Sequence, residues 1–339
     1  MKELIVVTGG LGYIGSHTVV ALIEANYEVL IVDNLSNSTI SALDCIESIV
    51  GFRPEFHQLD LCDKFELDVF FKECQKSISA IIHFAAFKNV GESTQNPLKY
   101  YRNNLDSLIN LIDLMNLHNV SNLVFSSSCS VYGDADTIPV KENTKLQLAA
   151  SPYGNTKRIS EDIIQDSAKI GMVSAISLRY FNPIGAHPSG NLGEFPSKFA
   201  DNIMPALTET ASGKRKELLV YGNAYNTIDG SCIRDYIDIM DLAEAHICAV
   251  RRMLEVDVEG NLEVFNIGTG KGVSVLELIS SFERVTGNTM NYKIVDSRDG
   301  DVEKIYADPS LANSILGWKA KHSLDDSVRT SWSWQQNIN

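Results

Sequence analysis

The sequence has little positive charge: 29 lysines and arginines stand against 43 aspartates and glutamates, a formal net charge of −14. A protein that wraps a nucleic acid neutralises phosphates with a basic face. Nucleic acid is therefore excluded as an expected partner. A local basic pocket for a small phosphorylated ligand is still allowed by this composition.

Long hydrophobic runs are also absent. None approaches the roughly 20 residues that a helix needs to cross a bilayer, so no membrane partner is expected. The apolar run Leu4–Val7 leads directly into glycines and lacks the pattern of a signal peptide. The six cysteines form no C-x-x-C pair and are expected to be reduced thiols. We therefore expect a cytoplasmic protein.

Metal-ligand spacing is missing as well. The seven histidines are scattered through the chain, and we predict no metal site. His83 and His187 are interpreted as structural residues.

Short apolar runs alternate with helical stretches in the first half of the chain. Leu4–Val7 and Val29–Val32 have the continuous hydrophobicity of strands that are buried on both faces, and weaker runs follow them. Strand and helix in alternation predict an α/β fold, a Rossmann-type doubly wound parallel sheet. A change of texture near residue 180 divides the 339 residues into 1–180, the Rossmann domain, and 181–339, a smaller mixed α/β domain for substrate. We expect some later segments to return to the first domain.

A glycine-rich turn follows the first strand. Gly9, Gly12 and Gly15 form a G-x-x-G-x-x-G pattern at the start of a helix, which suits the close approach of a pyrophosphate. Asp33 ends the second strand, where a carboxylate meets a ribose 2′-hydroxyl, and this favours NAD over NADP. Alone, such a turn could bind nothing, but its context predicts a dinucleotide site.

A second acidic position, Asp60, precedes Leu61 after the third strand. It could contact the adenine amino group or could cap the next helix, and spacing alone does not separate these readings.

Tyr153 and Lys157 lie four residues apart on a predicted helix and therefore share a face. A neighbouring ammonium, helped by a positive nicotinamide ring, would stabilise the tyrosine phenolate and lower its pKa. The usual alternative is a solvated surface pair. The serine run Ser126–Ser128 leaves the end of a strand and could supply a hydroxyl to the same reacting oxygen.

Together, Gly9-x-x-Gly12-x-x-Gly15, His83–Ala86, Ser126–Gly133 and Tyr153-x-x-x-Lys157 resemble the extended short-chain dehydrogenase/reductase family. More narrowly, Arg179–Pro183, Arg234–Tyr236 and other segments over nearly the whole chain resemble the UDP-galactose 4-epimerase family.

The resemblance implies Tyr153 as catalytic base, Lys157 as its electrostatic partner and ribose contact, and Ser128 as the hydroxyl beside Tyr153. NAD contacts are implied for Gly9, Gly12, Tyr13, Ile14, Gly15, Asp33, Asn34, Asn37, Ser38, Asp60, Leu61, Phe84, Ala85, Lys88, Asn103, Ser126, Tyr153, Lys157, Tyr180 and Phe181. UDP-sugar contacts are implied for Ser128, Tyr153, Asn182, Asn202, Ile203, Tyr221, Arg234, Arg298, Asp301 and Ile305. Arg234 and Arg298 suit a diphosphate, because guanidinium groups match phosphate oxygens.

The expected reaction is the reversible C4 epimerisation of UDP-galactose and UDP-glucose through a 4-ketosugar. The alternatives are an NAD-dependent dehydratase or decarboxylase of nucleotide sugars, or a non-catalytic dinucleotide sensor. A dehydratase would carry acidic residues after the catalytic hydroxyl, where this chain has Cys129 and Ser130. A sensor would have lost the tyrosine, lysine or hydroxyl.

Two further expectations follow from the resemblance. Ile305 occupies a position over the sugar C2 substituent that is often a bulky tyrosine, so UDP-N-acetylhexosamines are possible substrates. The helix with the apolar stripe from Tyr101 to Met115 packs against its own sheet. Relatives also pair this helix and the helix that bears Tyr153 across a two-fold axis into a four-helix contact. A homodimer is therefore expected.

Overall fold

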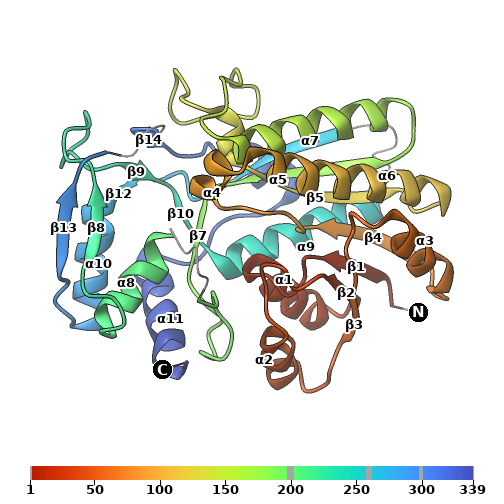
Figure 1. The fold of residues 1–339 in the computed structure, drawn as a ribbon, viewed down its shortest axis with the longest axis horizontal. Coiled ribbons are helices and arrows are strands. Elements are labelled where there is room, and N and C mark those ends of the chain that lie inside the picture. Colours follow the sequence, from red (N-terminus) through yellow and green to blue (C-terminus); the bar gives the residue numbers. More distant parts are fainter. Residues whose placement is uncertain (1, 197–201, 257–261, 298–300, 339) are drawn as a thin grey trace.

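The computed structural model describes residues 2–196, 202–256, 262–297 and 301–338. Seven parallel strands form one sheet in the order β11-β6-β5-β4-β1-β2-β3 (Figure 1). These strands are β1 (Leu4–Thr8), β2 (Glu28–Asp33), β3 (Glu55–Gln58), β4 (Ile78–His83), β5 (Asn122–Ser128), β6 (Ser174–Tyr180) and β11 (Leu262–Ile267). The strand order reverses between β1 and β4, which is the switch point of a doubly wound sheet. The predicted Rossmann-type fold is confirmed.

Helices cover both faces of the sheet, as the continuous apolar strands require. Helices α1 (Tyr13–Glu24), α2 (Ser41–Val50) and α9 (Ile239–Glu255) pack against one face, and α3 (Lys64–Glu73), α6 (Ser107–Leu117) and α7 (Pro152–Lys169) pack against the other. Alternate residues of β1 serve the two cores: Ile5 and Val7 contact one, and Leu4 and Val6 contact the other.

The predicted helix from Pro97 to Leu117 is observed with one irregularity. Between α5 (Pro97–Tyr101) and α6 (Ser107–Leu117), the segment Arg102–Asp106 forms a π-helical turn. Of the predicted apolar stripe, Leu108, Ile112 and Met115 pack on the sheet, whereas Tyr101 and Leu105 are half-buried and lie outside that core. The short helix α4 (Val90–Gln95) precedes it.

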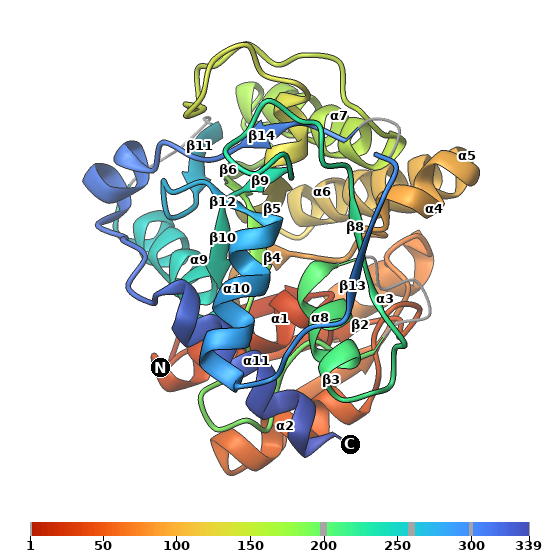
Figure 2. The ribbon, with the colours of Figure 1, turned by 90° about the vertical axis from the view of Figure 1, so that its left-hand side faces the viewer.

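The remaining elements lie beside the carboxyl ends of the sheet strands (Figure 2). They comprise α8 (Ile203–Ala211), α10 (Val275–Thr286) and α11 (Leu324–Asn337), the parallel pair β8 (Leu218–Tyr221) and β13 (Tyr292–Val295), the pair β7 (Asn182–Ile184) and β10 (Tyr236–Asp238), and β9 (Ile233–Arg234), β12 (Val273–Ser274) and β14 (Lys304–Ile305). Their core includes Leu207, Val220, Leu278 and Phe282.

The chain returns to the sheet after residue 181. Strand β11 pairs with β6 at the sheet edge, and α9 packs against α1. None of the described helices is long and apolar enough to cross a membrane.

Candidate active site

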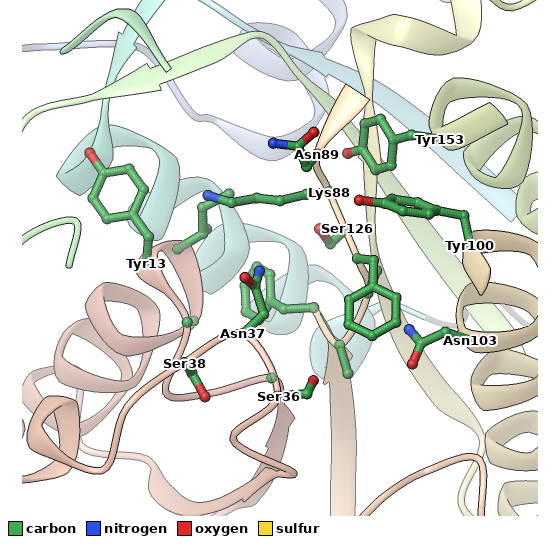
Figure 3. Close-up of a pocket in the computed structure, with 18 of the residues that line it drawn as sticks. Tyr13, Ser36, Asn37, Ser38, Lys88, Asn89, Tyr100, Asn103, Ser126 and Tyr153 are labelled. Atoms are coloured by element: carbon green, nitrogen blue, oxygen red, sulfur yellow. The ribbon is translucent and has the colours of Figure 1, made fainter. Parts of the chain in front are cut away.

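A cavity of about 580 Å³ opens at the carboxyl ends of the central strands. It crosses the switch point, because one wall follows β1 and another follows β4 (Figure 3). Most of the residues predicted to contact the cofactor line it: Gly9, Gly12, Tyr13, Ile14, Gly15, Asp33, Asn34, Asn37, Ser38, Asp60, Leu61, Phe84, Ala85, Lys88, Asn103, Ser126, Tyr153, Lys157 and Tyr180. Three predicted substrate contacts, Asn202, Tyr221 and Asp301, line it as well.

The glycine-rich turn depends on the absence of side chains at two positions. Gly9 has a φ of +70°, and a Cβ there would lie 2.7 Å from the amide nitrogen of Ala85. At Gly15, a Cβ would lie 2.3 Å from the carbonyl oxygen of Gly9. Only glycine allows the turn, the β4 end and the first turn of α1 to lie this close together.

Helix α1 begins in this turn with free N–H groups. Gly12 is its N-cap residue, no side chain caps it, and its first turn carries no acidic residue. An anionic group fits such a helix end because both the N–H groups and the helix dipole favour it. The described residues therefore fit the pyrophosphate of a dinucleotide.

Asp33 ends β2 with a buried carboxylate that is already hydrogen-bonded. Its Oδ2 accepts from the Leu11 N–H at 3.0 Å, and its Oδ1 accepts from the Ser38 hydroxyl at 2.7 Å. The carboxylate therefore ties the glycine-rich turn to the loop after β2, besides lining the cavity where a ribose is predicted.

The two readings of Asp60 are separated by the structure. The N-cap of α3 is Asp63, whose carboxylate accepts from the N–H groups of Phe65 and Glu66. Asp60 instead accepts from the N–H of Cys62 and lines the cavity. The helix-cap reading of Asp60 is wrong.

Tyr153 and Lys157 enter the cavity from the first two turns of α7. Ser151 caps this helix by accepting from the Gly154 N–H, and Pro152 occupies its first position, so the sequence places Tyr153 directly at the helix start. Both side chains are buried, which rules out a solvated surface pair. The Lys157 Nζ donates to the Ser126 carbonyl oxygen at 2.6 Å.

The acidity of this pair differs from the prediction. Burial raises the pKa of Tyr153 far above its ordinary value, and a hydrogen bond with Ser128 opposes this only in part. Burial also lowers the pKa of Lys157 to about 7, against a smaller raising effect of Glu161. The sequence predicts a stabilised phenolate because it shows the neighbouring charge but not the depth of burial.

Ser128 ends β5 and begins the short 3₁₀ turn Cys129–Tyr132. Its hydroxyl accepts from the Ser130 N–H at 3.2 Å and also hydrogen-bonds the Tyr153 phenol. The positions after it, Cys129 and Ser130, bring no carboxylate to this place.

Two ion pairs hold the cations around the cavity. The Lys88 Nζ donates to Glu194 Oε1 at 3.1 Å, and the Asn202 amide donates to the same oxygen at 2.7 Å. The Arg234 guanidinium lies 3.4 Å from Asp301 Oδ1. Arg298, the other predicted diphosphate contact, lies outside the described residues.

The other predicted contacts among the described residues do not line the cavity: Ser128, Phe181, Asn182, Ile203, Arg234 and Ile305. Phe181 and Ile305 are buried in one apolar cluster, and Ile203 packs at the edge of another. Asn182 begins β7, and its buried Oδ1 accepts no hydrogen bond from the described part of the chain.

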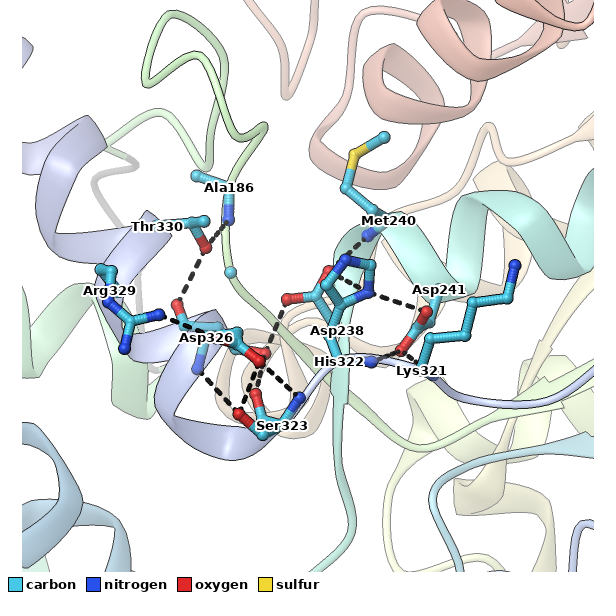
Figure 4. A network of polar contacts seen from close by, with 12 residues as sticks. Ala186, Asp238, Met240, Asp241, Lys321, His322, Ser323, Asp326, Arg329 and Thr330 are labelled. Atoms are coloured by element: carbon cyan, nitrogen blue, oxygen red, sulfur yellow. Dashed lines mark hydrogen bonds and ion pairs between the residues drawn. The ribbon is translucent and has the colours of Figure 1, made fainter.

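Tyr13 is positioned by a loop that helix α11 holds in place. The Tyr13 hydroxyl donates to the Gly185 carbonyl oxygen at 2.6 Å. Helix α11 holds this loop, because the Ser331 hydroxyl accepts from the Gly185 N–H and the Thr330 hydroxyl accepts from the Ala186 N–H. Figure 4 shows how the start of α11 is in turn fixed to α9, where Asp241 accepts from the backbone and ring of His322.

Some residues in or near the cavity were not predicted from the sequence. Tyr100 and Glu194 line the cavity without belonging to any motif, and only their tertiary contacts bring them there. Glu161 does carry a signal: the spacing of Tyr153, Lys157 and Glu161 places all three on one face of α7. In the described residues, no cluster of His, Cys, Asp and Glu is arranged to hold a metal ion.

Comparison with known proteins identifies relatives over nearly the whole length. The family model described as GDP-mannose 4,6 dehydratase matches residues 6–331. A UDP-glucose 4-epimerase of Dictyostelium discoideum is 49% identical over 336 residues, which are 99% of this chain and 96% of that protein. The crystal structure of a UDP-glucose 4-epimerase from Stenotrophomonas maltophila with bound NAD and formylated UDP-arabinopyranose has a TM-score of 0.94 and 42% identity, covering 99% of this chain and 98% of that one. The enzyme from Bifidobacterium longum, in complex with NAD+ and UDP, also has a TM-score of 0.94, at 40% identity and the same coverage.

Proposed function

Because the chain belongs to the UDP-glucose 4-epimerase family of the extended short-chain dehydrogenases/reductases, we propose that Tyr153, Lys157 and Ser128 carry out its chemistry. The protein is an NAD-dependent isomerase that reversibly interconverts UDP-galactose and UDP-glucose at C4. The observation that supports these roles is that one cavity receives the glycine-rich turn, Tyr153 and Lys157 together.

NAD would lie along the described cavity wall. The α1 N-terminus would hold the pyrophosphate, Asp33 would accept from the adenosine ribose, and Asp60 would face the adenine. When bound, the cofactor supplies at its nicotinamide a hydride acceptor and donor and, in the oxidised form, a positive charge near the phenol.

Tyr153 would take up the proton of the sugar C4 hydroxyl and later return it. Burial opposes the phenolate, so the ammonium of Lys157 is required to stabilise it. The Ser128 hydroxyl, which hydrogen-bonds the phenol, would also contact the reacting oxygen. These groups supply proton transfer and orientation at C4.

The UDP-sugar would be held mainly by residues of 181–339. Arg234 would pair with the diphosphate, and Asn182 at the start of β7 would contact the ligand. Epimerisation requires both faces of C4 to meet the same cofactor. The protein would therefore bind UDP tightly and the hexose loosely, with the Rossmann part of 1–180 holding NAD.

A dehydratase reaction is disfavoured by the residues beside Tyr153. Elimination of water across C5–C6 calls for an acid near the catalytic hydroxyl. Cys129 and Ser130 hold those positions, and burial raises the pKa of the Cys129 thiol to about 12, so it is no substitute for a carboxylic acid.

The assignment is tested by measuring the UDP-glucose that purified protein forms from UDP-galactose, with and without added NAD. We expect turnover without net consumption of NAD. Stoichiometric NADH, or a 4-keto-6-deoxy product, would contradict it.

We extend the proposal to UDP-N-acetylhexosamines. Ile305 lies in a cluster with Phe181 and Val131 and does not reach the cavity. The space that a tyrosine would occupy is therefore left to the C2 substituent of the sugar.

Replacing Ile305 with tyrosine is expected to lower turnover of UDP-N-acetylglucosamine about tenfold or more relative to UDP-galactose. Ile305 is buried in its cluster, so the larger ring has to find room outside that cluster, and the proposal places it beside the C2 substituent. Comparing kcat/KM for both substrates measures the effect, with Ile305→Val as the control that adds no bulk. If the unchanged protein epimerises UDP-galactose but not UDP-N-acetylglucosamine, the extension is wrong.

A homodimer is proposed through the outer side of α5 and α6. Leu98 and Ile109 are 69% and 47% exposed there, and Leu105 lies half-buried between them. Burying such side chains against a second copy of α5 and α6 would remove apolar surface from water.

Replacing Ile109 with aspartate is expected to weaken dimerisation by about tenfold or more, because the charge would be buried in the contact. Sedimentation at micromolar concentration measures this. Phe52→Asp, at an exposed position after α2 on the opposite face of the sheet, serves as the control. A monomeric unchanged protein would overturn the proposal.

We also propose a reducing, cytoplasmic compartment. All six cysteines carry free thiols, and such thiols persist where glutathione keeps them reduced.

A further inference from the structure

A buried carboxylate lies one helical turn beyond Lys157. Glu161 of α7 is 5% exposed, and four donors converge on it. Its Oε1 accepts from the hydroxyls of Ser127 and Ser177 at 2.6 and 2.9 Å. The Arg179 guanidinium donates to both carboxylate oxygens, with its Nη2 2.6 Å from Oε2. These donors satisfy the hydrogen-bonding capacity of both carboxylate oxygens in the interior.

We propose that Glu161 is a positioning residue for proton transfer, whose carboxylate keeps the Lys157 ammonium charged and directed toward the reacting tyrosine. This inference rests on the proposed roles of Lys157 and Tyr153.

The geometry joins Glu161 to Lys157 in two ways. Residues four apart on a helix share a face, so the carboxylate follows the ammonium along α7. The same strand also anchors both side chains: the Lys157 Nζ donates to the carbonyl of Ser126, and the next residue, Ser127, donates to Glu161. A shift of the carboxylate would therefore move the carbonyl that orients the ammonium.

The other groups around Lys157 supply no compensating negative charge. His83 on β4 is buried, and burial followed by the Lys157 charge lowers its pKa to about 3, so it is neutral. Tyr153 and Tyr180 are buried phenols whose pKa values burial raises. Further charged or titratable groups near this site are Arg179, Tyr100 and Cys129.

The buried Lys157 ammonium requires a nearby negative charge. Burial lowers the pKa of Lys157 to about 7, and among the residues that the structure describes Glu161 is the one group that raises it. Arg179 pairs with the carboxylate and also donates to the Tyr132 hydroxyl and the Glu142 carbonyl. It therefore holds the carboxylate in place from β6.

The test is Glu161→Gln, followed by lysine side-chain NMR and by the pH dependence of kcat. Loss of a negative charge disfavours a nearby cation and favours a nearby anion. We therefore expect the pH at which Lys157 titrates to fall by about 1 pH unit or more. Both limbs of the pH–rate profile should move to lower pH, since the Tyr153 phenolate also becomes easier to form. The Lys157 signal is assigned by its loss in Lys157→Arg.

Two variants separate charge from structure. Ser177→Ala removes a donor to the same carboxylate and no charge, so it should lower the melting temperature and leave the pH at which Lys157 titrates unchanged. Glu161→Asp keeps the charge, so Lys157 should titrate at a pH close to that of the unchanged protein. This variant also provides a test if Glu161→Gln does not fold. If Lys157 titrates at an unchanged pH in Glu161→Gln, or shifts as far in Ser177→Ala, the inference is overturned. If Lys157 shifts but the rate profile does not follow it, the proposed role of Lys157 fails instead.

Discussion

Replacement of Tyr153 with phenylalanine is expected to lower the rate of epimerisation by about 10²–10⁴-fold. The ring is buried and keeps its packing, so the variant loses only the phenol oxygen that accepts and returns the C4 proton in the proposed mechanism. The coupled assay for UDP-glucose formed from UDP-galactose measures the rate. The NAD released on denaturation shows whether the cofactor site is intact.

Tyr101 on the neighbouring helix α5 provides the control for this variant. The Tyr101 hydroxyl accepts from the Asn155 amide at 2.7 Å and does not line the cavity. Tyr101→Phe should cost about 1 kcal/mol of stability and leave the rate near that of the unchanged protein. A Tyr153→Phe enzyme within tenfold of the original rate would show that another group is the base.

Substitution of Gly15 by alanine is expected to abolish retention of NAD. The new Cβ would lie 2.3 Å from the Gly9 carbonyl and 2.8 Å from the Gly10 Cα, both of them backbone atoms. These atoms have little freedom to move, because Gly9 N donates to the Val32 carbonyl and Asp33 holds the Leu11 N–H. A strain of about 3 kcal/mol would weaken NAD binding roughly 100-fold.

The matched variant is Gly51→Ala, at the C-terminus of α2. This glycine has a φ of +82°, and nothing lies within 4 Å of an added Cβ. It should lose about 1 kcal/mol of stability and keep NAD. Calorimetric titration with NAD compares the two proteins, and equal affinities would contradict the role of Gly15.

The fold could be predicted where one residue pattern has one physical solution. Leu4–Val7 and Val29–Val32 are strands as predicted, because apolar runs of that length are buried on both faces only in a parallel sheet. The π-helical turn Arg102–Asp106 was not predicted, because the spacing of its apolar residues still fits a continuous helix. The pairing of β11 with β6 joins residues about 90 positions apart, and no local signal gives that pairing.

The site could be predicted as far as its motifs reach. Gly9, Asp33, Tyr153 and Lys157 line one cavity, because each stands at the carboxyl end of a strand or the start of the following helix. Their hydrogen-bond partners could not be predicted. The Glu194 contact with Lys88 depends on how a distant loop packs, and the pKa of Tyr153 depends on burial that no motif encodes.

The attachment of Tyr13 to Gly185, and of that loop to α11, also governs when the protein matures during synthesis. A nascent chain that has left the ribosome as far as residue 180 contains the glycine-rich turn and the tyrosine–lysine pair. It has not yet made α9, which covers α1, or β11, which pairs with the exposed edge of β6. The acceptor for the Tyr13 hydroxyl follows at Gly185, and Thr330 and Ser331 fix that loop only once α11 has been made. The glycine-rich turn is thus translated long before the helix that completes its support, and the nucleotide site matures when α11 folds.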